Sequence, residues 1–81
     1  MPVLTPTSWK EFEKFLLFVG CTYKRQTGGH KIYNREGLKR PIVIPAHGTI
    51  PVFVIRNNLR LLGITPEGYS EILKRKKSKR S

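Results

Sequence analysis

Carboxylates and cysteines are scarce in this 81-residue chain. It has no aspartate, five glutamates and one cysteine, Cys21. A two-metal nuclease needs clustered carboxylates, and these glutamates are scattered, so the sequence argues against that class. One cysteine and two distant histidines cannot supply the four close ligands of a structural zinc site, and no Walker loop or dinucleotide fingerprint is present. We therefore expect no cofactor. A single cysteine forms no internal disulfide, which favours a cytoplasmic protein.

Long apolar runs are also missing. The longest spans residues 15–19, whereas a membrane helix needs about 20 apolar residues. The first residues lack the basic start and apolar centre of a signal peptide. We expect a soluble protein with no membrane partner.

Positive charge is what the chain has in excess. Sixteen Lys and Arg residues give a formal net charge of +11. Solubility alone needs only a small net charge on a mixed-sign surface. The excess predicts a polyanionic partner, which is a nucleic acid, an acidic protein or each in turn.

The spacing of apolar residues predicts three helices and three strands. Ser8 and Glu11 form a capping box for a helix that ends at Gly20. Its predicted apolar face comprises Trp9, Phe12, Phe15, Leu16 and Val19. Segments 21–26, 30–34 and 41–45 predict an antiparallel meander, 46–49 a loop, and two further helices follow Pro51 and Thr65.

This order predicts an α+β fold with a three-stranded antiparallel sheet and helices packed on one face. Without the last helix, it is the order of double-stranded-RNA-binding domains. We divide the chain into a leader (1–7), a folded domain (8–73) and a basic tail (74–81) that we expect to be disordered.

The stretch from Thr27 to Tyr33 carries the candidate chemistry. Gly28 and Gly29 predict a tight turn that another molecule can approach closely, and His30 follows directly. Imidazole suits proton transfer near neutral pH, and RNA supplies its own nucleophile, the 2′-hydroxyl. We expect three basic residues to surround the imidazole and hold the phosphate, namely Lys24, Arg25 and Lys31.

Strand alternation constrains where His30 points. It places His30 with Ile32 on one face and Lys31 with Tyr33 on the other. If Ile32 faces the core, strict alternation buries His30. We therefore expect His30 at the first position of its strand, where the glycine turn frees it from the pleat.

For three residues the sequence is compatible with both a structural and a functional role. His30 suits a satisfied turn as well as catalysis. His47 suits a loop or cap as well as an auxiliary role in the site. Tyr33 is expected to cover the sheet, although it would also suit stacking on a base.

The glycine-histidine hairpin, followed by Ile42–Pro45 and then His47, resembles the HicA (YcfA-like) mRNA interferase family over about residues 8–73. The resemblance implies a toxin that cleaves mRNA without a metal, and a HicB-type antitoxin that blocks its active site. It places the catalytic histidine at His30. Where the family often has serine, this chain has Gly29, and where a second histidine is common it has Lys31. The competing hypothesis is a non-catalytic RNA-binding module, for instance a ribosome-associated protein.

Overall fold

The computed structural model describes residues 4–78, with side chains up to Lys74. Its elements are β1 (Thr7–Ser8), α1 (Trp9–Phe18), β2 (Thr22–Thr27), β3 (His30–Asn34), β4 (Ile42–Pro45), β5 (Thr49–Ile50), α2 (Val52–Leu62) and α3 (Pro66–Ser78).

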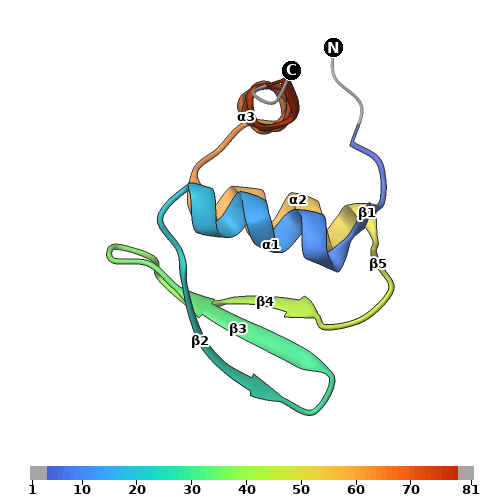
Figure 1. Ribbon diagram of the computed structural model, residues 1–81. Helices are drawn as coiled ribbons and strands as arrows, with labels where there is room; N and C mark the ends of the chain where they lie inside the picture. Colours follow the sequence, from blue (N-terminus) through green and yellow to red (C-terminus); the bar gives the residue numbers. More distant parts are fainter. Residues whose placement is uncertain (1–3, 79–81) are drawn as a thin grey trace.

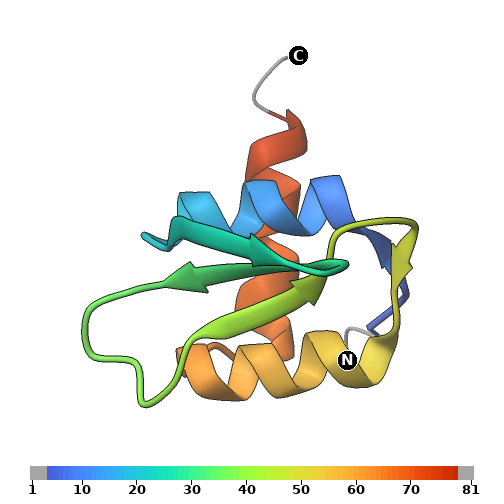
Figure 2. The same cartoon turned by 90° about the horizontal axis from the view of Figure 1, so that it is seen from below.

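The elements form three layers (Figure 1). The antiparallel sheet β2-β3-β4 is the first layer, and α1 and α2 lie side by side over one of its faces. The third layer is α3, which crosses the far side of the helix pair (Figure 2). The predicted α+β class, three-stranded sheet and one-sided helices are therefore confirmed. None of the described helices has the length and apolar character needed to cross a membrane.

Helix α1 begins after Ser8 as predicted, with one of the two hydrogen bonds of the predicted capping box. The Glu11 N–H donates to Ser8 Oγ at 3.3 Å, while the Glu11 carboxylate lies 3.8 Å from Lys14 Nζ. The helix ends at Phe18 with Val19 as its C-cap, and Gly20 follows with a φ of 97°, which is accessible to glycine because it has no Cβ.

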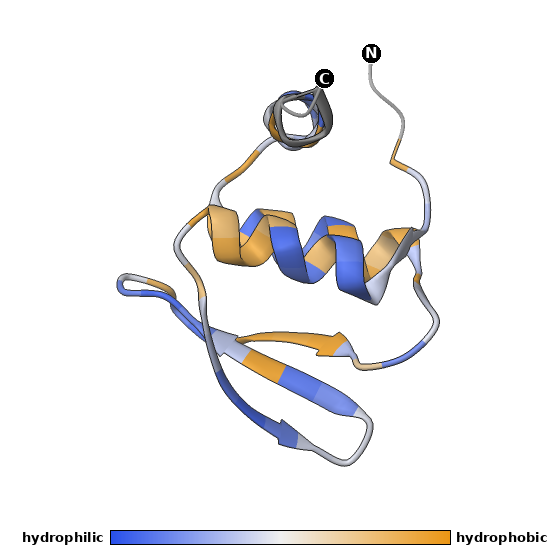
Figure 3. Ribbon diagram, viewed as in Figure 1, coloured by the Kyte–Doolittle hydropathy of each residue, from blue (hydrophilic) through white to orange (hydrophobic). Residues whose placement is uncertain are grey.

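The core lies between the sheet and the two helix layers. Buried aliphatic and aromatic side chains come from every layer, and β4 is apolar along its length whereas β2 is largely hydrophilic (Figure 3). Phe15 and Tyr69 meet edge to face, with ring centroids 4.8 Å apart, which ties α3 to α1. The fully buried residues on the sheet side are Tyr33, Ile42 and Ile44, and those on the helices include Phe12, Phe15, Leu16 and Ile55.

The free edge of β4 is largely closed to further strands. The Val43 carbonyl points away from β3 and accepts from Asn58 Nδ2 at 3.4 Å. By alternation, Pro41 and Pro45 point the same way and have no N–H to offer. Among residues 41–45, the Val43 N–H is therefore the only donor left on that edge, which disfavours pairing with another strand.

Two boundaries differ from the sequence-based expectations. Residues Thr7–Ser8 pair with Thr49–Ile50, so a small second sheet uses the end of the predicted leader and the predicted 46–49 loop. Such two-residue strands have no detectable periodicity. Helix α2 begins at Val52, directly after Pro51 as predicted, and Pro51 is its N-cap. Helix α3 continues to Ser78, because lysine and arginine are good helix formers. The rest of the predicted disordered tail, 79–81, lies outside the described residues.

Candidate functional site

His30 is exposed at the first position of β3, on the face of the sheet that the helices leave open. It lies opposite Thr27 of β2 and Pro45 of β4. The helix-covered face belongs to Tyr33, whose side chain is 0 % exposed. The premise that Ile32 faces the core is therefore wrong. His30 is exposed because regular alternation along β3 places it on the face opposite the core. The glycine turn is not needed to explain its exposure.

The glycine turn brings the two histidines to one end of the sheet. Gly28 has a φ of 59°, which glycine adopts readily. The Ala46 N–H donates to the Gly29 carbonyl at 2.8 Å and fixes the segment after β4 against the turn. The imidazole of His47 lies against Gly29, since a Cβ there would be 3.7 Å from Cδ2 and 3.8 Å from Nε2. His30 and His47 thus flank the same glycine, and both are exposed.

A β-bulge places Arg25 on the open face. Tyr23 is opposite Tyr33, yet Arg25 is opposite Ile32, so Lys24 is an extra residue in β2. Without it, Arg25 would share the helix-covered face with Tyr23. Bulges commonly redirect side chains in this way beside functional sites. Arg25 and Lys24 are both exposed.

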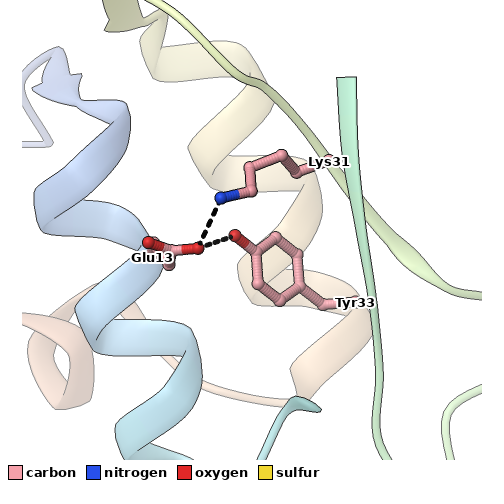
Figure 4. A network of polar contacts seen from close by, with 3 residues as sticks. All are labelled: Glu13, Lys31 and Tyr33. Atoms are coloured by element: carbon pink, nitrogen blue, oxygen red, sulfur yellow. Dashed lines mark hydrogen bonds and ion pairs between the residues drawn. The ribbon is translucent and has the colours of Figure 1, made fainter. Parts of the chain in front are cut away.

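Lys31 is not part of this cluster. Its ammonium lies on the helix-covered side, 3.0 Å from the Glu13 carboxylate (Figure 4). It also lies 4.7 Å from the ring centroid of Trp9 and 5.2 Å from that of Tyr23. The expectation that Lys31 surrounds His30 with positive charge was wrong, because neighbouring residues of a strand point to opposite faces.

Tyr33 is likewise committed to the fold. Its hydroxyl donates to the same Glu13 oxygen at 2.5 Å, and its buried ring is not available to stack on a base. Burial alone would raise the pKa of Glu13, but hydrogen bonds from Tyr33 and Lys31 hold that pKa below its ordinary value. Burial and the neighbouring carboxylate raise the pKa of Tyr33. Glu13 therefore joins α1 to β3, a role that the sequence analysis missed.

Arg35 is a second residue whose role was missed. Its guanidinium donates to the Val19 carbonyl at 3.1 Å and to the Leu62 carbonyl at 3.3 Å. These carbonyls end α1 and α2, where free acceptors and the helix dipole favour a cation. The available signal was its alternation with Lys31 and Tyr33 on one face.

The family model described as the HicA toxin of bacterial toxin-antitoxin matches residues 9–64. The chain belongs to the HicA toxin family. The match spans more than half of the chain and contains both histidines and the glycine turn, whereas α3 lies beyond it. It confirms the resemblance inferred from the sequence motifs. Among curated proteins and among solved structures, nothing matches this chain significantly.

Charge is unevenly divided over the chain. The five glutamates lie on α1, on α3 and in the loop after β3, and the strands β2, β3 and β4 contain none. Within residues 4–78, no three histidine, cysteine or acidic side chains gather closely enough to hold a metal ion. The open face therefore has basic groups and imidazole, without carboxylates from its own strands.

Proposed function

We propose that this HicA toxin is an endoribonuclease that cleaves mRNA without a metal ion and thereby stops translation, with His30 transferring the proton. The observation that carries the proposal is the position of His30: exposed on a face with Arg25 and no strand carboxylate, directly after a glycine turn.

The reaction needs little beyond what these residues offer. The 2′-oxygen of a ribose attacks the adjacent phosphorus and loses its proton, and the 5′-oxygen leaves and gains one. The products are a 2′,3′-cyclic phosphate and a 5′-hydroxyl. Histidine, with a reference pKa of about 6.5, is suited to either transfer and contributes roughly 10² to 10⁴ in rate.

The other site residues have supporting roles in this proposal. Arg25 and Lys24 offset the charge that develops on the phosphate. Gly28 and Gly29 let the RNA backbone come close, because no Cβ stands in the way. His47, which lies against Gly29, is an auxiliary group for the second proton or for contact with the phosphate.

The absence of a metal in the proposal rests on the donor set. The chain has no aspartate, and none of its glutamates lies on a strand of the open face. Two-metal cleavage depends on such carboxylates.

The toxin family implies an antitoxin. We propose a HicB-type protein that covers His30 and has acidic groups complementary to the net charge of +11. The toxin would act in the cytoplasm, where mRNA is translated.

Cleavage in the presence of EDTA tests the proposal. RNA and DNA of one sequence are incubated with the wild-type protein, with His30→Ala and with the control Thr27→Ala, whose side chain lies opposite His30. We expect the wild type and Thr27→Ala to cut RNA only, and His30→Ala to bind RNA without cutting it. RNA that is bound but left intact by the wild type would favour the non-catalytic RNA-binding module.

A further inference from the structure

Two aliphatic side chains stand in the middle of the open face. Ile32 and Val43 lie directly opposite each other on β3 and β4. Val43 is 42 % exposed and Ile32 is half-buried. In an antiparallel ladder, pairs joined by hydrogen bonds alternate with pairs that are not. The hydrogen bond between Ala46 and Gly29 marks a bonded pair, and counting along the strands from it makes Ile32 and Val43 a non-hydrogen-bonded pair. Side chains approach most closely in pairs of that kind. We call this pair the apolar step.

The surroundings of the apolar step are polar and basic. Arg25 lies opposite Ile32 on the β2 side. His30 is the next residue of β3 on the same face, about 6.6 Å away along the strand from a rise of about 3.3 Å per residue. No described element covers this face, which is turned toward the viewer in Figure 2. Apolar surface in this position adds nothing to the core, which lies on the other side of the sheet.

We propose that the apolar step seats a nucleobase next to the scissile bond, while Arg25 holds the adjacent backbone. This rests on the proposed ribonuclease function and specifies its substrate: single-stranded RNA with an unstacked base. Apolar side chains can receive the flat face of a base that has left its stack. In an A-form duplex those faces are stacked, and the bases are read poorly. Duplex RNA is therefore a poor substrate, although the fold resembles that of duplex-binding domains.

The same features favour RNA over a protein as the occupant. The apolar step consists of two side chains, whereas protein-binding patches usually extend over several hundred Å². Arg25 and the lack of strand carboxylates complement a phosphate backbone.

The test uses a DNA oligonucleotide with a single ribonucleotide, so that cleavage occurs at one place. A second version lacks the base at the ribonucleotide, and a third lacks it at the following nucleotide. Single-turnover cleavage in EDTA is compared for the wild type, Ile32→Thr and Val43→Thr, since threonine keeps the β-branched shape and removes apolar surface. Leu17→Gln is the matched control, because Leu17 is 50 % exposed on α1, away from this face.

We expect each threonine variant to slow cleavage of the intact oligonucleotide about fivefold, which is the scale of one lost apolar group. On one abasic version the wild type should be slowed as well, and the variants should cause no further loss. A complementary strand should slow the wild type more than tenfold. Leu17→Gln should behave as the wild type.

Other results overturn the assignment. If the variants slow the abasic oligonucleotides as much as the intact one, the base does not contact the apolar step. Normal cleavage by both threonine variants would show that the apolar step does not bind the RNA, and would favour a protein partner at that surface. If the wild type cuts no oligonucleotide, the proposed ribonuclease function is wrong. If it cuts, but the effect of the threonine variants does not depend on the base, only the proposal that the apolar step binds a base is wrong.

Discussion

The two faces of β3 differ in what their side chains do. On the helix-covered face, Lys31 and Tyr33 meet at Glu13, and Arg35, just beyond the strand, reaches the ends of α1 and α2. On the open face, His30 and Ile32 point away from the helices and are at least partly exposed. One strand thus joins the layers with one set of residues and presents the site with the other.

Positive charge alone therefore does not identify the candidate RNA-binding residues. Lys31 lies next to His30 in the sequence, yet it is paired with Glu13. Arg25 is five residues from His30 in the sequence, yet it shares the face of His30. Substitutions on the helix-covered face should therefore change stability, and those on the open face should change activity.

The largest effect is expected for His30→Ala. Its cleavage rate should fall about 10²- to 10⁴-fold, because the proposed proton-transfer group is lost. Its free energy of unfolding should stay within about 0.5 kcal/mol of the wild type, since the side chain is exposed. Single-turnover assays and urea denaturation measure the two quantities. A large loss of stability would show that His30 belongs to the structural set after all.

Arg35→Met should be the most destabilising change in this comparison. It removes two hydrogen bonds from a charged donor and should lower the free energy of unfolding by about 2 to 3 kcal/mol. The matched control is Arg25→Met on the open face, which should change it by less than about 0.5 kcal/mol. Urea denaturation measures the free energy of unfolding of both variants. If both lose the same amount, the division between a structural face and a functional face is wrong.

Tyr33→Phe tests the network at Glu13 through its pH dependence. Removing a hydrogen bond to a charged carboxylate should cost about 1.5 kcal/mol at pH 7. The pKa of Glu13 is lower in the folded protein than its ordinary 4.5, so this stabilisation is present above about pH 4.5 and is lost as the pH falls through the folded value. The difference between variant and wild type should therefore shrink in acid. A difference that stays constant through the whole acid range in which Glu13 titrates in the wild-type protein would show that the carboxylate is not the acceptor.

Much of the fold could be predicted because its signals are local. Ser8, Gly20 and Gly28 mark a helix start, a helix end and a turn through their own backbone chemistry, and β3 has the predicted limits. Which face of β3 the helices cover could not be predicted from the residues of the strand alone. Alternation defines two faces, but Ile32 and Tyr33 are both good core residues. In the structure Tyr33 is the one covered, and its hydroxyl meets Glu13 of α1, a contact that depends on how α1 packs.

The candidate site was predictable only in part, for the same reason. His30 and the glycine turn follow from adjacent residues, and Arg25 was named for its charge. Its place on the open face depends on the bulge at Lys24, and the spacing of apolar residues in the sequence does not predict that bulge. The role of Arg35 depends on two helix ends meeting it in space.

The smallest expected effect compares two basic residues by their salt dependence. If Arg25 contacts one phosphate, Arg25→Gln should reduce the slope of log affinity against log salt by about 0.7 for single-stranded RNA. Lys31→Gln should leave that slope unchanged and lower stability instead. Fluorescence anisotropy with a labelled RNA in the His30→Ala background measures the slopes without cleavage. Equal slope changes for the two variants would remove the distinction between them.

The most direct test of the account is the product formed at a single ribonucleotide in otherwise deoxyribose DNA, in EDTA. The account predicts one cut, directly after the ribonucleotide, with a 2′,3′-cyclic phosphate on one product and a 5′-hydroxyl on the other, and no cut when His30 is alanine. Cutting of the all-deoxy oligonucleotide, or unchanged cutting by His30→Ala, would contradict it.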